Sequence, residues 1–399
     1  MEVERPNLRK KRKVDWSFLP KDLFDLIAKR LRPADLIKVS CVCNSWRSNS
    51  HPFHLCLVLP CHNIITIDDD NDDDNKNSKD GEIKSSSDPE KALSFVGFVN
   101  LSQPSRKVHK LQIPEVNGST ILGSSAGWLV TLRANGAIRL LHPFSRAKIQ
   151  LPPLKLARFG GSMSKISKMS IEKVIVCSGL DGKSLILCKY AGKLAFYRPE
   201  TDHNWVSFKH YRGVIEDIVS YKGRFYGIRI GRNKCHICVA CDLDDPSPAM
   251  EEVVEIPKYS GYIQYYLVES LGNLLLVLRH LNWPIGYETS NFTVFRLDNG
   301  GMVKLKDLAG QALFLDCNSA FSISASDDFA AIKGNHIYFV TTCLPNEDWF
   351  GCCDMEVFNL EDETFESFDY SDEPELIMNA PMVFPTNPCW RGGLGFRMV

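Results

Sequence analysis

Residues 16–47 read WSFLPKDLFDLIAKRLRPADLIKVSCVCNSWR, and their apolar side chains repeat with the spacing of amphipathic helices. Pro20 stands where the first turn of a helix tolerates proline, and Pro33 ends the first helical pattern. We therefore expect residues 14–50 to form a small all-α unit of two or three short helices. The apolar positions of the two runs are Leu23, Phe24, Leu26, Ile27, Ala28 and Leu31, then Leu36, Ile37, Val39, Val42 and Trp46.

The size of this helical unit points to a partner. Units of about 40 residues seldom fold alone without disulfides, a metal or another protein. Nothing within residues 14–50 suggests a metal site. We expect its apolar face to complete a core against another protein. The alternative is that the unit packs on the rest of its own chain.

The order of these residues resembles an F-box. The resemblance rests on Leu19-Pro20, on the Asp22-Leu23 pair that leads into a helix, and on VCNSWR at 42–47. It implies docking on the small adaptor of Skp–cullin–F-box ubiquitin ligases, and through that adaptor on a cullin. By matching position, the adaptor-binding or F-box core residues would be Leu19, Pro20, Leu23, Leu26, Ile27, Leu36, Val39 and Trp46.

The pattern changes after residue 91. Short segments rich in β-branched and aromatic residues, such as WLVTL at 128–132 and RFYGI at 224–228, are bounded by turn residues. We expect residues 91–390 to form an all-β domain, so that the chain is α+β and multidomain. A glycine precedes a short strand at several positions, which suggests a repeat. Blades of roughly 40–50 residues would give a β-propeller of about six blades. A pair of β-sandwiches would show similar strands. The glycines are Gly127, Gly192, Gly223, Gly272 and Gly334.

This half resembles the C-terminal part of a large group of plant F-box proteins with a kelch-like domain of unknown function. The similar stretches lie at 127–154, 312–340 and 355–365, and MVFP at 382–385 approximates the ending of that group. The resemblance implies a kelch-like β-propeller that captures a target protein. It brings no known ligand and no catalytic residue.

Residues 68–90 contain ten acidic side chains and one large aliphatic side chain, Ile83. Such a segment cannot bury enough apolar surface to offset the entropy of ordering. We expect a disordered acidic loop or linker, with a partner-binding acidic motif as the alternative. Residues 51–67 would connect the helical unit to this linker and could contain a first strand. Residues 391–399 are expected to form a C-terminal tail.

Five consecutive cations, Arg9, Lys10, Lys11, Arg12 and Lys13, lie in the basic segment 1–13. The formal net charge of the chain is −1, so the whole molecule has no electrostatic reason to seek nucleic acid. A short exposed basic run is typical of a nuclear import signal. We therefore expect importin as a partner and a nuclear location, with cytoplasm as a second location. The alternatives are a solvated tail and a nucleic-acid contact.

Other chemistry finds little support in the sequence. The apolar stretches are a few residues long, too short for a membrane helix, and residues 1–20 contain no secretory signal. We therefore expect an intracellular protein whose 14 cysteines are reduced. The best zinc candidate is Cys235, Cys238 and Cys241, but no second C-x-x-C completes a tetrahedral site, and a buried strand is the alternative.

We therefore expect no cofactor, no metal and no catalytic residue. The function that these observations favour is a substrate-recognition subunit: the F-box-like unit docks on the adaptor, and the β-domain binds a target. One alternative is a scaffold or sensor whose β-domain binds a small ligand or nucleic acid without ubiquitin transfer. Another is a propeller enzyme.

Overall fold

The chain divides into two compact units, Met1–Phe53 and His54–Val399, in a computed structural model. The structure describes residues 16–28, 30–31, 35, 39, 43, 45–46, 54–60, 95–100, 108–133, 135–154, 171–178, 184–208, 213–232, 234–241, 243–245, 248–282, 288–298, 300–316, 318–325, 332–340, 355–368 and 382–386.

The first unit begins with a 3₁₀ turn, η1 (Trp16–Phe18), followed by the helix α1 (Lys21–Ala28). The Phe24 amide donates to the Pro20 carbonyl at 3.0 Å and so starts the helical ladder. Asp22 lies in the first turn, where a negative charge stabilises a helix. The predicted first helix is thereby confirmed. Of the second predicted run, Asp35, Val39, Ser45 and Trp46 have helical backbone, and the remainder lies outside the described residues.

Phe24 and Trp46 form the contact that ties α1 to the end of the helical unit. The Phe24 side chain is 1% exposed, and its ring meets that of Trp46 edge to face at 5.7 Å. The indole Nε1 of Trp46 donates to the Trp16 carbonyl at 2.7 Å. The two aromatic side chains therefore join η1, α1 and the closing segment into one small core.

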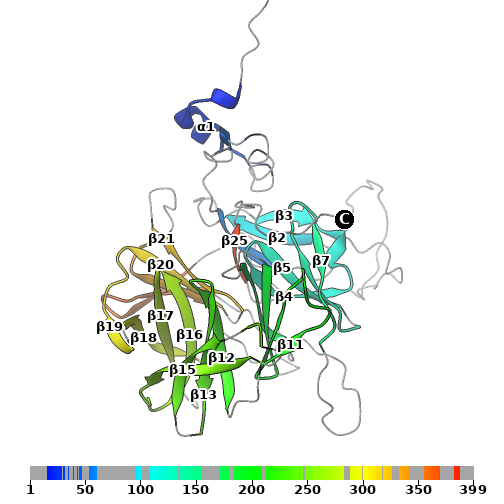
Figure 1. Ribbon diagram of the computed structural model, residues 1–399. Helices are drawn as coiled ribbons and strands as arrows, with labels where there is room; N and C mark the ends of the chain where they lie inside the picture. Colours follow the sequence, from blue (N-terminus) through cyan, green and yellow to red (C-terminus); the bar gives the residue numbers. More distant parts are fainter. Residues whose placement is uncertain are drawn as a thin grey trace, which may run out of the picture. The chain divides into compact units, whose positions relative to one another are not determined.

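The second unit is built almost wholly of strands (Figure 1). A short 3₁₀ turn, η2 (Pro114–Val116), precedes its second sheet. The described strands form six sheets, whose neighbours in order are β25-β1-β2-β3, β4-β5-β6-β7, β11-β10-β9-β8, β12-β13-β14-β15, β16-β17-β18-β19 and β21-β20-β22-β23-β24. The bounds are β1 (His54–Pro60), β2 (Phe95–Asn100), β3 (Val108–Gln112), β4 (Ser119–Ser125), β5 (Trp128–Arg133), β6 (Ile138–Leu141), β7 (Lys148–Gln150), β8 (Ile171–Ser178), β9 (Ser184–Tyr190), β10 (Lys193–Tyr197), β11 (Val206–Ser207), β12 (Val214–Tyr221), β13 (Arg224–Ile230), β14 (Cys235–Cys241), β15 (Ala249–Ile256), β16 (Tyr262–Ser270), β17 (Asn273–Leu281), β18 (Thr289–Asp298), β19 (Gly301–Leu305), β20 (Gln311–Leu315), β21 (Ala320–Ser324), β22 (His336–Val340), β23 (Met355–Asn359), β24 (Thr364–Ser367) and β25 (Met382–Thr386).

One edge strand of each sheet faces a common centre. Strand β25 lies beside β4, β4 beside β8, β8 beside β12, β12 beside β16, and β16 beside β21. This radial order of sheets is typical of a β-propeller and does not fit a pair of sandwiches. We call β4, β8, β12, β16, β21 and β25 the inner strands.

The first sheet joins the two ends of the second unit. Strand β1 pairs with β2 on one side and with β25 on the other, so that Leu57 lies opposite both Val99 and Val383. The last described strand therefore completes the sheet that the first strand begins. Such pairing holds a ring of sheets closed.

This pairing changes the expected boundary between the two units. Residues 51–67 were expected to connect the helical unit to a linker and were thought able to contain a first strand. The strand is confirmed at 54–60, but it belongs to the β-rich unit, which begins at His54. The acidic stretch 68–90 lies outside the described residues, but the strands on either side of it are neighbours in one sheet. It therefore connects β1 to β2 and does not separate the units.

Buried clusters lie between consecutive sheets, because most strands bury both faces. All seven residues of β9 are buried. Its Ile186 and Cys188 pack with the β4–β7 sheet, while Leu185 and Leu187 pack toward the β12–β15 sheet. Successive strand side chains point to opposite faces, so one hydrophobic run serves two interfaces.

Four glycines of the sequence repeat, Gly127, Gly192, Gly223 and Gly272, lie in two-residue hairpin turns, whereas Gly334 precedes β22, which pairs with β20 in parallel. Lys222 and Gly223, between β12 and β13, have φ of 48° and 72°, and Leu271 and Gly272, between β16 and β17, have 49° and 70°. Two successive positive φ angles define the turn that best fits twisted hairpins, and glycine adopts them freely. Gly192 lies between β9 and β10, the second hairpin of its sheet, which explains the uneven spacing of these glycines.

Candidate functional site

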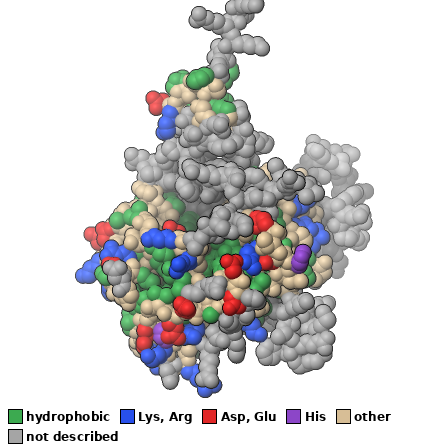
Figure 2. All heavy atoms as spheres, viewed as in Figure 1, with side chains coloured by type: hydrophobic (Ala, Val, Ile, Leu, Met, Phe, Trp, Pro, Cys, Tyr) green, Lys and Arg blue, Asp and Glu red, His purple; other side chains and the backbone are tan. Residues whose placement is uncertain are grey.

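The first unit exposes an apolar face on and before α1. Leu23, Leu26 and Ile27 are spaced i, i+3 and i+4, so they lie on one side of the helix. Their exposed fractions are 50%, 56% and 42%. Trp16 and Phe18 are also exposed, and hydrophobic side chains are visible on the surface of this unit (Figure 2). We call Trp16, Phe18, Leu23, Leu26 and Ile27 the exposed apolar face.

An apolar set of this kind on so small a unit marks an interaction surface. Single exposed hydrophobic residues are ordinary, but contiguous exposed patches on soluble proteins mark sites of association. Phe24 lies next to this set on the helix and is buried against Trp46. Phe24 therefore holds the unit together, while Leu23, Leu26 and Ile27 stay exposed beside it.

The structure places most of the predicted adaptor-binding residues. Pro20, Leu23, Leu26 and Ile27 are exposed, whereas Leu19, Val39 and Trp46 are partly buried. Trp46 belongs to the core of the unit through Phe24. Leu36 lies outside the described residues, as do the predicted import residues 9–13.

Sequence reasoning missed three residues of this site. Phe24 was not among the predicted site residues, although it anchors the core, and exposed Trp16 and Phe18 were left out of the adaptor set. Helical periodicity groups residues by face, but it does not say which of two apolar faces turns inward. The signal that could have found Phe24 is its ring, because Phe24 is the one aromatic residue of α1 and aromatic side chains bury a large area in a core.

A second candidate region lies where inner strands meet at the centre of the β-rich unit. Three consecutive inner strands carry a β-bulge, with Leu122, Glu172 and Glu216 as the extra residues in β4, β8 and β12. A bulge re-aims side chains and is common beside functional sites. Here two of the three extra residues are carboxylates.

Buried charges join three inner strands around these bulges. The Lys173 ammonium of β8 lies 2.7 Å from Asp217 Oδ1 of β12, and both side chains are less than a tenth exposed. Asp217 Oδ2 accepts the Leu267 amide of β16 at 2.8 Å. Lys189 pairs with Glu172 at 2.7 Å and donates to the Glu216 carbonyl at 2.6 Å. Except for the Lys189–Glu172 pair, which lies within one sheet, these contacts cross from sheet to sheet and fix the inner strands against one another.

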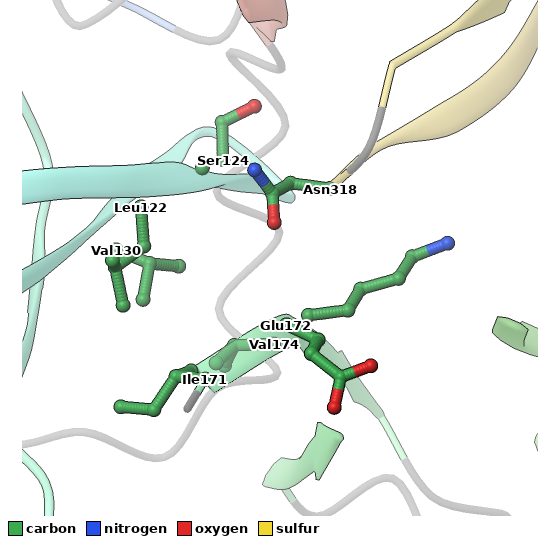
Figure 3. Close-up of a pocket in the computed structure, with 9 residues that line it drawn as sticks. Leu122, Ser124, Val130, Ile171, Glu172, Val174 and Asn318 are labelled. Carbon is green, nitrogen blue, oxygen red and sulfur yellow. The ribbon is translucent and has the colours of Figure 1, made fainter. Parts of the chain in front are cut away.

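The recess beside this cluster is small (Figure 3). Leu122, Val130, Ile171 and Val174 form its apolar side, and Ser124, Glu172 and Asn318 supply polar groups. Asn318 lies so close to Gly123 that a Cβ at Gly123 would stand 2.6 Å from that of Asn318. The recess has space for about one water molecule. It is too small for an organic substrate.

The cysteine-rich segment 235–241 is strand β14, as the buried-strand alternative predicted. Cys238 is buried and Cys235 partly buried, and burial raises the pKa of both thiols to about 11. Both therefore stay protonated at neutral pH and are poor nucleophiles. Within the described residues, no group of three or more His, Cys, Asp or Glu is arranged to hold a metal ion.

Two further expectations concern membrane helices and catalytic residues. No helix in the described part of the chain is both long and apolar enough to cross a membrane. The sequence predicted no catalytic residue, and that expectation stays a prediction.

Comparison with known families matches both units. The F-box domain model matches residues 16–55, and the KIB1-4 beta-propeller model matches residues 98–362. The match to the F-box domain begins at Trp16, where the exposed apolar face begins. The resemblance inferred from Leu19-Pro20 and VCNSWR is thereby confirmed, whereas the kelch-like detail stays a prediction.

Similar proteins extend over nearly the whole chain. The F-box protein SKIP23 of Arabidopsis thaliana is 27% identical and covers 92% of this chain and 92% of its own length. The F-box protein At2g17036 of the same plant is 24% identical with the same coverage. Among solved structures, a putative 6-phosphogluconolactonase from Bacteroides uniformis matches with a TM-score of 0.37 and 10% identity, over 79% of this chain and 82% of that chain. A likeness that distant carries no conclusion about activity.

Proposed function

The chain belongs to the KIB1-4 β-propeller family and carries an F-box domain, and from this membership we propose that it is the substrate-recognition subunit of a Skp–cullin–F-box ubiquitin ligase. In this proposal the F-box docks on a Skp-type adaptor, and through it on a cullin, while the propeller binds a target protein. The observation that carries the proposal is the exposed apolar face on a unit that the F-box model matches.

The proposed role is non-catalytic. The subunit would hold a lysine of the target near ubiquitin that a separate enzyme carries, so its contribution is proximity and a raised effective concentration. The relatives with matching coverage, which are named F-box proteins, support this reading.

Co-purification with the adaptor tests the proposal. The full chain is expressed with a Skp-type adaptor, and the experiment is repeated with Leu19→Ala and Pro20→Ala combined. We expect the parent to retain the adaptor and the double variant to lose it. Failure of the parent to bind, or full binding by the double variant, would refute the receptor role. Adaptor binding without any ubiquitination-dependent turnover of bound proteins would instead favour the scaffold or sensor alternative.

We also propose that each of the six sheets is one propeller blade, with β25 completing the blade of β1, β2 and β3. The order of the inner strands supports this count. An experimental structure of the chain in its adaptor complex would test it. Five radial sheets in place of six would contradict the count.

The basic run is proposed to direct the protein to the nucleus through importin. It supplies five consecutive cations, Arg9, Lys10, Lys11, Arg12 and Lys13, in a chain of net charge −1. Deletion of residues 9–13 from a fluorescently tagged protein should abolish nuclear enrichment. Unchanged enrichment after the deletion would refute the import role.

A further inference from the structure

Strand β24 is an unprotected outer edge of the β-rich unit. It ends the sheet β21-β20-β22-β23-β24, and all four of its residues, Thr364–Ser367, are exposed. It contains no lysine, no proline and no bulge in its pairing with β23. Proteins protect edge strands by such means, because an unpaired edge is a template for another strand. The outer strands of the other described sheets are protected by Lys110 in β3, Lys148 in β7, the two-residue length of β11, the bulge at Val253 in β15 and Lys304 in β19.

The backbone of β24 directs two residues outward. The Phe368 amide donates to the Met355 carbonyl at 3.3 Å, so these two residues form a hydrogen-bonded pair of the β23–β24 ladder. Such pairs alternate with unbonded ones along an antiparallel ladder. The peptide groups of Phe365 and Ser367 therefore point away from β23, and each offers an N–H and a C=O at the edge. The backbone of an extended peptide supplies matching groups at the same spacing.

The seam beside this edge exposes apolar side chains. The Phe365 ring is 40% exposed and lies 4.9 Å from the ring of Phe358, which belongs to the buried cluster between β16–β19 and β20–β24. On β19, Leu305 packs against the same cluster. Val303 precedes Leu305 by two residues, so it points to the same seam, and it is 45% exposed. Each of the two sheets thus exposes one apolar side chain along this seam.

The edge fits an extended segment of another protein better than a second copy of this chain. In the antiparallel self-pairing that uses both outward residues, Phe365 lies opposite Ser367 of the other copy, so Glu366 lies opposite its own counterpart. Like charges directly opposite on paired strands are destabilising. Nucleic acid has no row of peptide groups to pair with the edge. Every second side chain of an added peptide strand would face the seam, so apolar residues at alternate positions would bury Phe365.

We infer that β24 is the strand on which the propeller takes its target, and that the target adds an extended segment to it, with aliphatic or aromatic side chains at alternate positions along the seam. We call Phe365, Ser367 and Val303 the open edge. The inference rests on the proposed function, because it names the chemistry of the target that such a receptor would capture.

Peptide selection tests the inference directly. A library of random short peptides displayed on phage is panned on the full chain. The enriched peptides should carry aliphatic or aromatic residues at alternate positions. Their affinity should fall at least about tenfold for Phe365→Ser and for Ser367→Pro, which removes an outward N–H but no bond to β23. The controls Ser367→Ala, which keeps that N–H, and Val253→Ser, at a 44% exposed position on β15, should leave binding unchanged.

Backbone methylation of a selected peptide separates strand addition from other binding modes and needs no variant of the protein. N-methyl groups placed one at a time remove successive N–H donors of the peptide. In an added strand, alternate N–H groups point to β24 and the others point to solvent. Affinity should therefore fall at every second position and stay at its original value between them. Methylation effects without this alternation overturn the inference.

The inference is also overturned if no peptide is enriched, or if Phe365→Ser and Ser367→Pro bind the enriched peptides as the parent does. A dimer of the full chain that Ser367→Pro disrupts would overturn it as well, because the edge would then belong to a second copy. Adaptor binding is measured on the same preparations. Failure of the parent to bind the adaptor, with peptide selection intact, would refute the receptor role alone. Adaptor binding without peptide selection would refute the open edge alone.

Discussion

The Asp217 carboxylate holds three inner strands together, and its removal should be costly. Asp217→Ala would leave the Lys173 ammonium, with its side chain 8% exposed, without its partner at 2.7 Å. The Leu267 amide would lose its acceptor at 2.8 Å as well. Breaking a buried ion pair by removing one partner costs about 3–5 kcal/mol, much of it from the charge left behind. We expect a loss of that size in the free energy of unfolding.

The same reasoning predicts how the loss can be relieved. Lys173→Met combined with Asp217→Asn removes both charges and keeps an amide oxygen for Leu267, so this double variant should be more stable than Asp217→Ala. The exposed pair Lys333–Glu366, 2.6 Å apart with side chains 57% and 45% exposed, is the matched control. Its variant Glu366→Ala should cost about 0–1 kcal/mol.

Urea unfolding of the full chain, followed by tryptophan fluorescence, measures these differences. Midpoints are compared among variants that share one slope, so that the shifts report stability. The reasoning is refuted if Asp217→Ala loses no more than Glu366→Ala, or if the double variant is as unstable as Asp217→Ala.

Three further predictions follow from single sites. Trp46→Ala should lower the free energy of unfolding of the helical unit by about 3–5 kcal/mol and abolish adaptor binding, whereas Trp46→Phe should lower it by only about 1 kcal/mol, because it loses the hydrogen bond to the Trp16 carbonyl. Hydrogen exchange of the α1 amides measures both effects. Equal protection of these amides in the parent and in Trp46→Ala would contradict the assigned core. Burial lowers the pKa of His142 from 6.5 to about 4, so the unfolded chain binds this proton first as the pH falls. The free energy of unfolding should drop by up to about 3 kcal/mol between pH 6.5 and 4, and His142→Asn should show a smaller drop in urea titrations; identical pH profiles would exclude this role. Gly123→Ala, whose Cβ would meet Asn318 at 2.6 Å, should lower the thermal midpoint through about 1–3 kcal/mol of overpacking, and an unchanged midpoint would show that Asn318 moves freely.

Local patterns in the sequence predicted the local structure well. The spacing of Leu23, Leu26 and Ile27 after Pro20 indicated α1, and the small size of the unit indicated an unpaired face, which these side chains provide. The repeated glycines indicated the starts of short strands, and β13 and β17 begin directly after Gly223 and Gly272, which have positive φ. These features depend on residues close together in the chain, which is why a sequence reveals them.

Long-range pairing was not predictable in the same way. Strand β1 pairs with β25, which lies more than three hundred residues later. Nothing in the sequence of His54–Pro60 indicates that it pairs with β25. The acidic composition of 68–90 indicated a disordered loop or linker, but composition does not reveal which elements a segment connects. The hydrogen bond from the Leu267 amide to Asp217 Oδ2 requires the bulge in β12 and the approach of two sheets, so the sequence alone did not single out either residue.

The affinity of the full chain for a Skp-type adaptor, measured by isothermal titration calorimetry, tests the central claim most directly. The critical variant combines Leu23→Ala, Leu26→Ala and Ile27→Ala, which trims the exposed apolar face and keeps good helix formers in α1. Burial of each half-exposed side chain contributes on the order of 1 kcal/mol, so the account predicts tight binding by the parent and a loss of about a hundredfold in the triple variant.

Arg30→Ala, at an exposed polar position just beyond α1, is the control and should bind as the parent does. A parent that does not bind the adaptor, or a triple variant that binds it with unchanged affinity, would contradict the account.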